Sequence, residues 1–248
     1  MLKNNKKIGT ALITGGAQRI GKEIAIKLAN LGYNIVISYN NSKQEAEELK
    51  NNIISEYQVN CEIFACDLLD VSQTKNLADF MVQNFDDWNL LINNASIFDK
   101  SKLLENKESE LFDNFNIHLF SPLILSKEFA INVGEKNIQN AQVINIVDKA
   151  ITRNKTEYFY YLLSKKSLAN LTKMLATQLS PAIRVNAVAP GFIMLPKNSD
   201  LDGDTLIDKI PLKKQGSLKN ITHAVQFLIE NDFVCGEILF VDGASSLV

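Results

Sequence analysis

The sequence predicts an α/β fold in which helices cover both faces of a doubly wound parallel sheet of about seven strands. Short apolar runs alternate with amphipathic segments along the whole chain, which is the βαβ rhythm of such sheets. Several runs are almost continuously apolar, as parallel strands buried on both faces are. No repeat, low-complexity tract or linker divides the 248 residues, so we expect one Rossmann-type domain over 1–248.

The elements follow one another in a regular order. Seven segments have the composition of buried strands: 8–14, 33–39, 61–67, 89–95, 141–147, 183–189 and 237–243. Five segments between them repeat apolar residues at helical spacing: 20–32, 43–55, 71–85, about 109–133 and 157–179. The segment 190–212 breaks this rhythm with prolines, glycines and acids, and we expect a substrate lid over 191–213.

Composition and charge exclude several classes of partner. The formal charge of −2 gives no reason to expect nucleic acid or an anionic membrane. No apolar stretch is long enough to span a bilayer, and the basic N-terminus precedes a strand, not a signal sequence, so we expect a cytoplasmic protein. Cys61, Cys66 and Cys235 are expected to be buried reduced thiols. His118, expected near a subunit contact, and His223 lie in separate helical segments, so no metal site is expected.

A tyrosine, a lysine and an aspartate form the most informative pattern. Tyr161 is the only tyrosine of EYFYYLLSKKS with a lysine four positions on, Lys165, so phenol and ammonium share a helix face. A lysine there can lower the phenol pKa by its charge and still bind a ligand hydroxyl. Asp148 stands at the C-terminal end of the strand 141–147, the edge at which open parallel sheets bind ligands. The pattern indicates an enzyme with a carboxylate beside its Tyr–Lys pair.

The first strand runs into a glycine-rich turn, Thr14-Gly15-Gly16-Ala17-Gln18-Arg19-Ile20-Gly21, at the start of a helix. Such a turn lets backbone N–H groups approach a pyrophosphate at the helix N-terminus. An ordinary strand–helix turn is the alternative, but the position after the first strand of a βαβ unit favours a dinucleotide site.

The end of the second strand distinguishes NAD from NADP. An acid there would bind the ribose 2′-hydroxyl of NAD, but the chain reads Asn40-Asn41-Ser42-Lys43 and has no carboxylate before Glu45. Amides, a hydroxyl, a lysine and a helix N-terminus suit a 2′-phosphate, so we expect NADP(H). A polar turn with a helix cap is the alternative. After the third strand, Asp67 either accepts from the adenine amino group or caps the next helix.

Further motifs carry a family resemblance. Asn93-Asn94-Ala95 after the fourth strand, Tyr161-x-x-x-Lys165, and Pro190-Gly191 after the sixth strand together resemble the short-chain dehydrogenase/reductase family over essentially the whole chain. The resemblance implies that Tyr161 is the acid/base and that Lys165 binds the nicotinamide ribose and lowers the pKa of Tyr161. It also implies a relay asparagine in the long helix, for which Asn116 is the matching position and Asn114 the other register.

Asp148 departs from the family pattern, because most members place a serine there. A serine hydroxyl can donate to a carbonyl oxygen that becomes an alkoxide, whereas an ionised aspartate opposes that charge. The carboxylate favours a substrate that offers N–H donors or needs a proton on nitrogen. It also favours the protonated form of Tyr161. The alternative is that Asp148 only caps a loop in a protein that has lost activity.

Four features resemble pteridine reductases and the related bacterial dihydromonapterin reductases: Arg19 in the glycine turn, Asn41-Ser42, the run Asn94-Ala95-Ser96-Ile97-Phe98, and Asp148. The resemblance implies that Phe98 stacks on a flat pterin opposite the nicotinamide. The implied reaction is NADPH-dependent reduction of dihydromonapterin or dihydrobiopterin to the tetrahydro form, with weaker reduction of dihydrofolate, by a homotetramer. A 3-ketoacyl or other carbonyl reductase and a non-catalytic NADP(H)-binding regulator are the alternatives.

These motifs assign each candidate residue a role. Catalytic roles fall to Tyr161, Lys165, Asp148 and Asn116. Cofactor contacts fall to Gly15, Arg19, Ile20, Gly21, Asn40, Asn41, Ser42, Asp67, Leu68, Asn94, Ala95, Ser96, Lys165, Pro190 and Gly191. Substrate contacts fall to Arg19, Ser96, Phe98, Asp148 and Tyr161.

Overall fold

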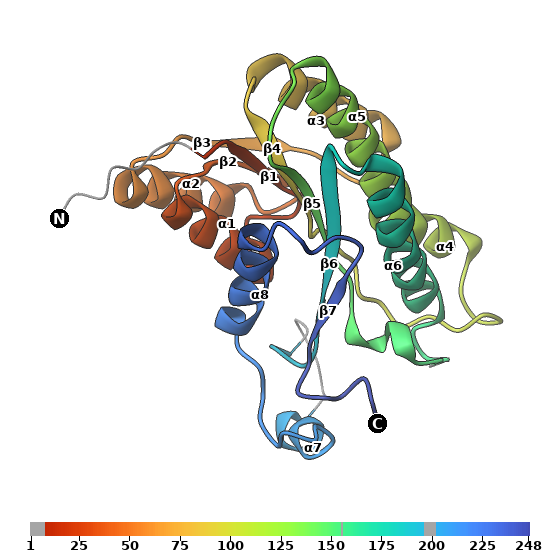
Figure 1. Ribbon diagram of the computed structural model, residues 1–248. Coiled ribbons are helices and arrows are strands. Elements are labelled where there is room, and N and C mark those ends of the chain that lie inside the picture. The colour runs from red at the N-terminus through yellow and green to blue at the C-terminus, as the bar shows by residue number, and fades with distance from the viewer. Residues whose placement is uncertain (1–7, 155, 196–201) are drawn as a thin grey trace.

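The computed structural model describes residues 8–154, 156–195 and 202–248. Its centre is a seven-stranded sheet with the strand order β3-β2-β1-β4-β5-β6-β7, and every neighbouring pair is parallel (Figure 1). The order reverses between β1 and β4, which creates a crevice at the carboxyl ends of these strands. The predicted doubly wound α/β fold is confirmed.

The strands and helices have the following bounds. The strands are β1 (Thr10–Ile13), β2 (Asn34–Tyr39), β3 (Cys61–Ala65), β4 (Trp88–Asn93), β5 (Ala141–Ile146), β6 (Ile183–Pro190) and β7 (Ile238–Val241). The α-helices are α1 (Arg19–Leu31), α2 (Lys43–Tyr57), α3 (Val71–Asn84), α4 (Glu108–Phe115), α5 (Ser121–Glu135), α6 (Phe159–Leu179), α7 (Gly203–Asp208) and α8 (Leu218–Glu230). A π-helical turn, η1 (Asn116–Phe120), joins α4 to α5, and a 3-10 turn, η2 (Lys149–Thr152), follows β5.

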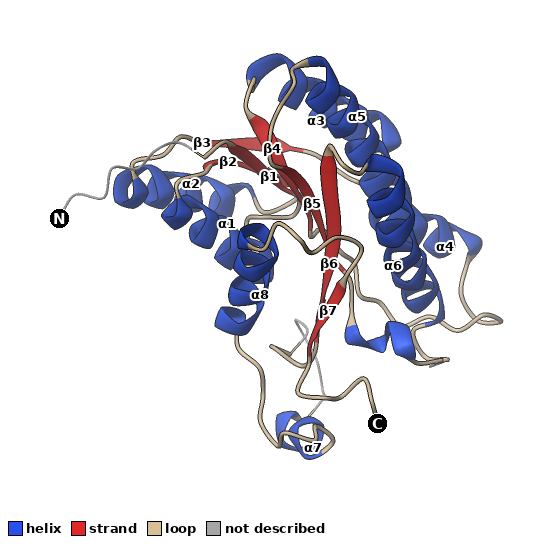
Figure 2. Cartoon of the chain, in the orientation of Figure 1, coloured by secondary structure: helices blue, strands red, loops and turns tan. Residues whose placement is uncertain are grey.

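Two apolar cores hold the layers together. Helices α1, α2 and α8 cover one face of the sheet, and α3, α5 and α6 cover the other (Figure 2). On the first face Ile24 and Leu28 of α1 are fully buried against the strands. On the second face the Trp88 ring lies 4.8 Å from that of Phe129, between centroids. The strands are therefore buried on both faces, which explains their almost continuous apolar runs.

The structure departs from the sequence prediction in two helical regions. The span 109–133 is not one helix, because the π-helical turn η1 interrupts it. Helix α8 was expected only as a helical segment around His223, without bounds, although Ser217 and Asn220 form a capping box at its start. The segment 191–213 contains α7, but 196–201 lie outside the described residues, so the lid stays a prediction.

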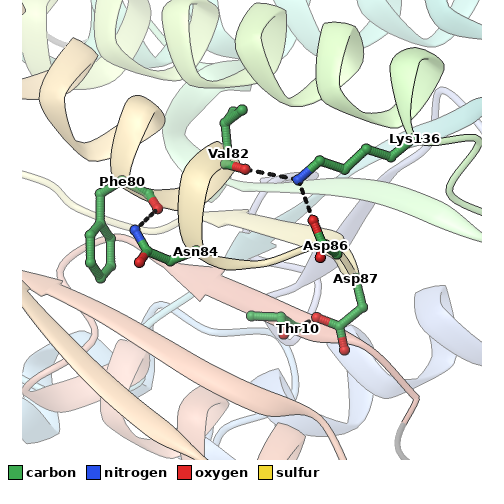
Figure 3. Close-up of polar contacts among 7 residues, drawn as sticks. All are labelled: Thr10, Phe80, Val82, Asn84, Asp86, Asp87 and Lys136. Carbon is green, nitrogen blue, oxygen red and sulfur yellow. Dashed lines mark hydrogen bonds and ion pairs between the residues drawn. The ribbon is translucent and has the colours of Figure 1, made fainter.

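Polar contacts fix the amino-terminal edge of the sheet (Figure 3). Lys136, at the end of α5, donates from Nζ to Val82 O at 2.8 Å and pairs with Asp86 at 2.8 Å. A cation is favourable at the exposed carbonyls that end a helix such as α3. Asp87 accepts from the Thr10 hydroxyl at 2.6 Å, which ties the α3–β4 connection to β1. These bonds close the amino-terminal edge and leave the carboxyl edge for ligands.

Within the described ranges, no helix is long and apolar enough to cross a membrane, and no group of three metal-binding side chains forms. Cys61 and Cys66 are free and buried, and burial raises the pKa of each thiol to about 12. Cys235 is exposed, so the expectation that it is buried was wrong. It lies just before β7, the last strand at the edge of the sheet.

Candidate active site

Asp148 and Tyr161 meet at the carboxyl edge of the sheet. Asp148 follows β5, and Tyr161 lies in the first turn of α6. The Tyr161 hydroxyl donates to Asp148 Oδ2 at 2.8 Å. The other carboxylate oxygen, Oδ1, accepts from the Ala150 backbone N–H at 2.7 Å. Asp148 therefore caps the short turn η2 and also accepts from the tyrosine, and its role toward a substrate stays a prediction.

The environment of Tyr161 keeps its phenol protonated. Burial raises the pKa of Tyr161 well above its ordinary value, and the charge and hydrogen bond of Asp148 raise it further. This agrees with the expected effect of Asp148. The pKa of Tyr161 thus rises on balance, and the lowering expected from Lys165, whose Nζ lies 5.9 Å from the centroid of the Tyr161 ring, stays a prediction. In this structure Tyr161 is a hydrogen-bond donor and a potential acid.

Lys165 is a buried cation directed at the end of β5. Its side chain is 2% exposed, and Nζ donates to Ile146 O at 2.8 Å. Burial lowers the pKa of Lys165 to about 8, and the nearby charge of Asp148 acts in the opposite direction. The ammonium is thus charged at neutral pH but loses its proton in a mildly alkaline range.

The helical region 116–120 brings a histidine to the tyrosine. The ring of His118 lies edge-on to Tyr161 with 5.4 Å between the ring centroids, and its side chain is fully buried. Asn116 instead donates from Nδ2 to Leu69 O at 3.0 Å, and Asn114 donates to Glu110 O. The relay role of Asn116 and the placing of His118 near a subunit contact both stay predictions.

The glycine turn leaves a cradle beside the start of α1. Gly15 has φ +59°, and a Cβ there would lie 3.0 Å from Ala95 Cα. A Cβ on Gly21 would lie 2.5 Å from Gly15 O. Helix α1 has no side-chain cap, and its first intrahelical bond runs from Lys22 N to Gln18 O, so the N–H groups of residues 19–21 have no partner within the helix. The predicted positions Arg19, Ile20 and Gly21 therefore fit an anionic ligand.

The end of β4 is fastened to this turn. Asn94 donates from Nδ2 to Thr14 O at 2.9 Å and to Gly15 O at 3.1 Å. The backbone N–H groups of Asn94 and Ala95 both donate to the Thr14 hydroxyl oxygen. These two predicted cofactor positions thus shape the cradle, since their backbone N–H groups are already engaged.

The predicted 2′-phosphate positions lie at the end of β2. Asn40 and Asn41 are exposed and carry no negative charge. Ser42 stands at the N-cap of α2 but does not cap it with its side chain; its hydroxyl accepts from Gln18 Nε2 at 3.0 Å. These side chains lie on the glycine-turn side of the sheet, which is compatible with one dinucleotide contacting both.

Asp67, which follows β3, does not cap the next helix. Asp67 accepts from Leu69 N at 3.0 Å, whereas the N-cap of α3 is Asp70, which accepts from Ser72 N at 2.8 Å. Asp67 as a helix cap was therefore wrong. Leu68 is buried, and its carbonyl accepts from the hydroxyl of Ser121 at 2.8 Å, which ties this connection to α5.

An aromatic wall stands over Tyr161. The Phe98 ring stacks on Tyr158 at 4.6 Å with an interplanar angle of 15°, and it meets Tyr161 edge-on at 4.8 Å. Phe98 is 43% exposed, so it is a rim residue and not part of the core. Tyr158 is a neighbour that the sequence reasoning did not consider, although it lies in the same tyrosine-rich run.

The opposite rim is formed by the glycine turn and the segment after β6. Arg19, exposed and with φ +53°, donates from Nη2 to Leu195 O at 3.0 Å. Gly191 N donates to Val241 O at 2.9 Å, and a Cβ on Gly191 would lie 2.5 Å from Asp242 Cα. Pro190 and Gly191 thus bring the chain back across the carboxyl edge at a place where only glycine fits.

The comparisons with known proteins agree with this geometry. Residues 15–245 match the family model described as enoyl-(acyl carrier protein) reductase, which represents short-chain dehydrogenases/reductases. The chain belongs to the short-chain dehydrogenase/reductase family. Members of this family are oxidoreductases that use NAD(P)H.

Named relatives fall into two groups. The chain is 32% identical over 252 residues to 3-oxoacyl-(acyl-carrier-protein) reductase FabG of Buchnera aphidicola subsp. Baizongia pistaciae, with 98% of each sequence covered. It is 28% identical over 244 residues to the FabG of Staphylococcus epidermidis, with 94% and 97% covered. Among solved structures, FolM alternative dihydrofolate reductase 1 from Brucella canis, complexed with NADP, has a TM-score of 0.89 at 32% identity, with 98% of this chain and 96% of that chain covered.

Proposed function

We propose that this protein is an NADPH-dependent reductase of a pterin, with dihydromonapterin or dihydrobiopterin reduced to the tetrahydro form and dihydrofolate a weaker substrate. The observation that carries the proposal is the 2.8 Å hydrogen bond from the Tyr161 hydroxyl to Asp148 Oδ2. The similarity to the FolM alternative dihydrofolate reductase supports it.

The proposed chemistry needs a protonated phenol and an acceptor beside it. The bound dinucleotide supplies hydride. Tyr161 donates a proton to the substrate. Its raised pKa keeps the phenol protonated at neutral pH, so the proton is available. Asp148 accepts hydrogen bonds from the N–H groups of a heterocycle and so orients the ring. A carbonyl oxygen has no N–H to donate, so a carbonyl substrate gains nothing from this carboxylate. Exposed Phe98 offers an aromatic face for the flat ring.

Two observations support a preference for NADP(H). The end of β2 carries Asn40, Asn41 and Ser42, without a carboxylate to repel a 2′-phosphate. The FolM structures from Brucella canis and Brucella suis were both determined with NADP. Lys165, which is buried and cationic, would bind the nicotinamide ribose, as the family resemblance implies.

Reduction of a 3-ketoacyl thioester is the second candidate, because curated relatives of similar identity carry the FabG name. Its transition state places negative charge on a carbonyl oxygen. Asp148 next to Tyr161 opposes that charge, since a carboxylate cannot donate a hydrogen bond to it. We therefore rank the pterin first.

A substrate panel tests the choice directly. NADPH oxidation at 340 nm is followed with dihydromonapterin, dihydrobiopterin, dihydrofolate and acetoacetyl thioester, and repeated with NADH. We expect turnover with the pterins, little with the thioester, and at least about tenfold higher kcat/KM with NADPH than with NADH, a difference that one charge-assisted contact to the 2′-phosphate supplies. Turnover of the thioester alone would reject the pterin proposal, and equal use of both nucleotides would reject the NADPH preference.

The buried lysine predicts an alkaline limit to activity. Lys165 loses its proton as the pH rises through its lowered pKa of about 8. We expect kcat/KM for NADPH, which reports the free enzyme, to fall above this pH. In Lys165→Arg the guanidinium stays charged, so this alkaline limb should disappear even if the variant is slower. A wild-type profile that stays flat up to about pH 9.5 would contradict the assignment.

The same ionisation should affect stability in the opposite direction. The unfolded lysine has its ordinary pKa of 10.5, so between about 8 and 10.5 the unfolded chain binds more protons than the folded one. The contribution of Lys165 to the free energy of unfolding therefore rises with pH across this window, while the activity falls. Urea unfolding of wild type and Lys165→Arg at the two ends of the window separates the two effects.

We also propose a homotetramer, as the resemblance implies. Large apolar side chains lie exposed along the outer helices: Leu123 and Ile131 on α5, and Leu163 and Met174 on α6. Association of copies through these helices would remove that surface from water.

A further inference from the structure

A chain of three side chains runs from the cleft rim to the helix that carries Tyr161. Ser96 Oγ lies 2.8 Å from His118 Nε2, and His118 Nδ1 lies 2.8 Å from Ser164 Oγ. Ser164 in turn donates to the backbone carbonyl of Tyr161 at 2.8 Å. Ser164 and His118 are fully buried, whereas Ser96 is exposed. The chemistry proposed above uses neither His118 nor Ser164.

The protons in this chain can be placed by elimination. The Tyr161 carbonyl can only accept, so the single hydroxyl proton of Ser164 points to it. Ser164 Oγ must then accept from His118, which places a proton on Nδ1. A neutral ring protonated on Nδ1 has a lone pair on Nε2, and Ser96 donates to that lone pair. The alternative acceptor of Ser96, the carbonyl of Ile97, lies farther away, at 3.1 Å.

The surroundings of His118 keep the ring neutral. Burial lowers the pKa of His118 well below its ordinary value, and the charge of Lys165 lowers it further, while a hydrogen bond with the Asn114 backbone acts in the opposite direction. Tyr161 faces the ring edge-on and is itself held protonated. The two groups on α6 that face the histidine are thus a cation and a neutral phenol, and neither stabilises an imidazolium.

We propose that neutral His118, protonated on Nδ1, is a positioning residue that draws the Ser96 hydroxyl proton inward, so that Ser96 presents only acceptor lone pairs to the cleft. The proposal deepens the proposed function and rests on it for the ligand class alone. Ser96 and the carboxylate of Asp148 are then two acceptors at one site, which together select a ligand edge that carries N–H donors. Ser96 is correspondingly a poor partner for a carbonyl or a pyrophosphate oxygen, because those groups need donors.

The tautomer can be measured without any substrate. The chain has 2 histidines, so ¹⁵N-histidine labelling of the full-length protein gives two ring systems, and His223→Gln assigns them. We expect His118 to show a protonated Nδ1 and an unprotonated Nε2, unchanged between about pH 5.5 and 8, with and without NADP⁺. A protonated Nε2, or a doubly protonated ring near pH 6.5, would overturn the proposal. This result is independent of the substrate panel, so a failure of the pterin assignment leaves it readable.

A double-mutant cycle tests whether His118 acts through Ser96. In His118→Asn the shorter amide can still donate to Ser164 but cannot reach Ser96. The variant therefore keeps one of the two side-chain hydrogen bonds of His118 and removes the other. We expect His118→Asn and Ser96→Ala each to raise KM for the pterin about tenfold with little change in kcat, the loss of one oriented hydrogen bond. The double variant should be no worse than either single one.

The remaining variants distinguish positioning from general damage. Ser164→Ala removes the acceptor for Nδ1 and should release the tautomer, giving an intermediate rise in KM. Multiplicative effects in the double variant, or a fall in kcat at unchanged KM, would show that His118 does not act through Ser96. Thermal unfolding of each variant identifies any loss that comes only from instability, and a His118→Gln variant, whose amide can reach Ser96, should recover part of the lost affinity.

Discussion

Tyr161→Phe is expected to lower kcat by about a thousandfold while leaving nucleotide binding intact. General acid catalysis by a positioned side chain contributes about 10²–10⁴-fold, and the phenol hydroxyl is the only group removed. The ring keeps its edge-on contacts with Phe98 and His118. Because the hydroxyl donates to Asp148, the variant also leaves that carboxylate without its 2.8 Å partner.

The measurement is steady-state NADPH oxidation with the preferred pterin, beside NADPH binding followed by nucleotide fluorescence. Tyr160→Phe is the matched control, since it removes the neighbouring buried phenol without touching Asp148, and we expect it to retain activity. Retention of a tenth or more of the wild-type kcat in Tyr161→Phe would remove Tyr161 from its role as acid. Equal, negligible activity in wild type and variant would favour the non-catalytic NADP(H)-binding regulator.

Most of the fold could be predicted from the sequence, because a parallel strand that is buried on both faces has an almost continuous apolar sequence. Ile35, Val36 and Ile37 of β2 are all buried, so their run is apolar at every position and not at alternate ones. Helix α8 shows where hydrophobic periodicity alone does not fix the bounds of a helix. Its buried Ile221, Val225 and Leu228 have helical spacing, but they follow a segment rich in turn residues that obscured the start of the helix.

The candidate site was predictable where it depended on spacing alone. Tyr161 and Lys165 share a face because a regular helix brings residues four apart together. Asp148 could be placed because the ends of parallel strands meet at one edge. His118 could not be placed in this way, since the π-helical turn at 116–120 changes the helical register and so changes which side chain faces α6.

The pKa values were less predictable than the positions. From the sequence, a lysine four residues from a tyrosine is expected to lower the phenol pKa. In the folded protein the burial of Tyr161 and the charge of Asp148 dominate, and the pKa of the phenol rises instead. Burial depends on the packing of helices that lie far apart in the chain, so it cannot be predicted from a local sequence motif.

Asp148→Ser is expected to lower kcat/KM for the pterin by about a hundredfold and to make carbonyl reduction easier. A hydrogen bond to a charged group contributes about 1.5–3 kcal/mol, which corresponds to roughly ten- to a hundredfold in affinity. The serine removes an acceptor for N–H donors and adds a donor for an alkoxide. It also removes the negative charge and the hydrogen bond of Asp148, both of which raise the pKa of Tyr161, so the pKa of the phenol should fall.

The control for this exchange must separate charge from shape. Asp148→Asn keeps an oxygen that can accept from the Ala150 N–H, as the aspartate does at 2.7 Å, so the turn η2 should keep its cap. A serine can cap the same turn, and both variants should therefore fold. If the negative charge selects the substrate, Asp148→Asn loses pterin reduction as Asp148→Ser does, and both variants gain activity with acetoacetyl thioester, because each replaces the carboxylate by a group that can donate a hydrogen bond.

The pH dependence of the variants provides a second, independent reading. With the carboxylate removed, the phenol of Tyr161 should titrate at a lower pH than in the wild type, and ultraviolet difference spectra report tyrosinate directly. Unchanged tyrosine titration together with unchanged pterin turnover in Asp148→Ser would show that the carboxylate neither holds the proton nor selects the ligand. Asp148 would then serve only to cap the turn η2 through its 2.7 Å bond from Ala150 N–H, and the thioester would become the better candidate substrate.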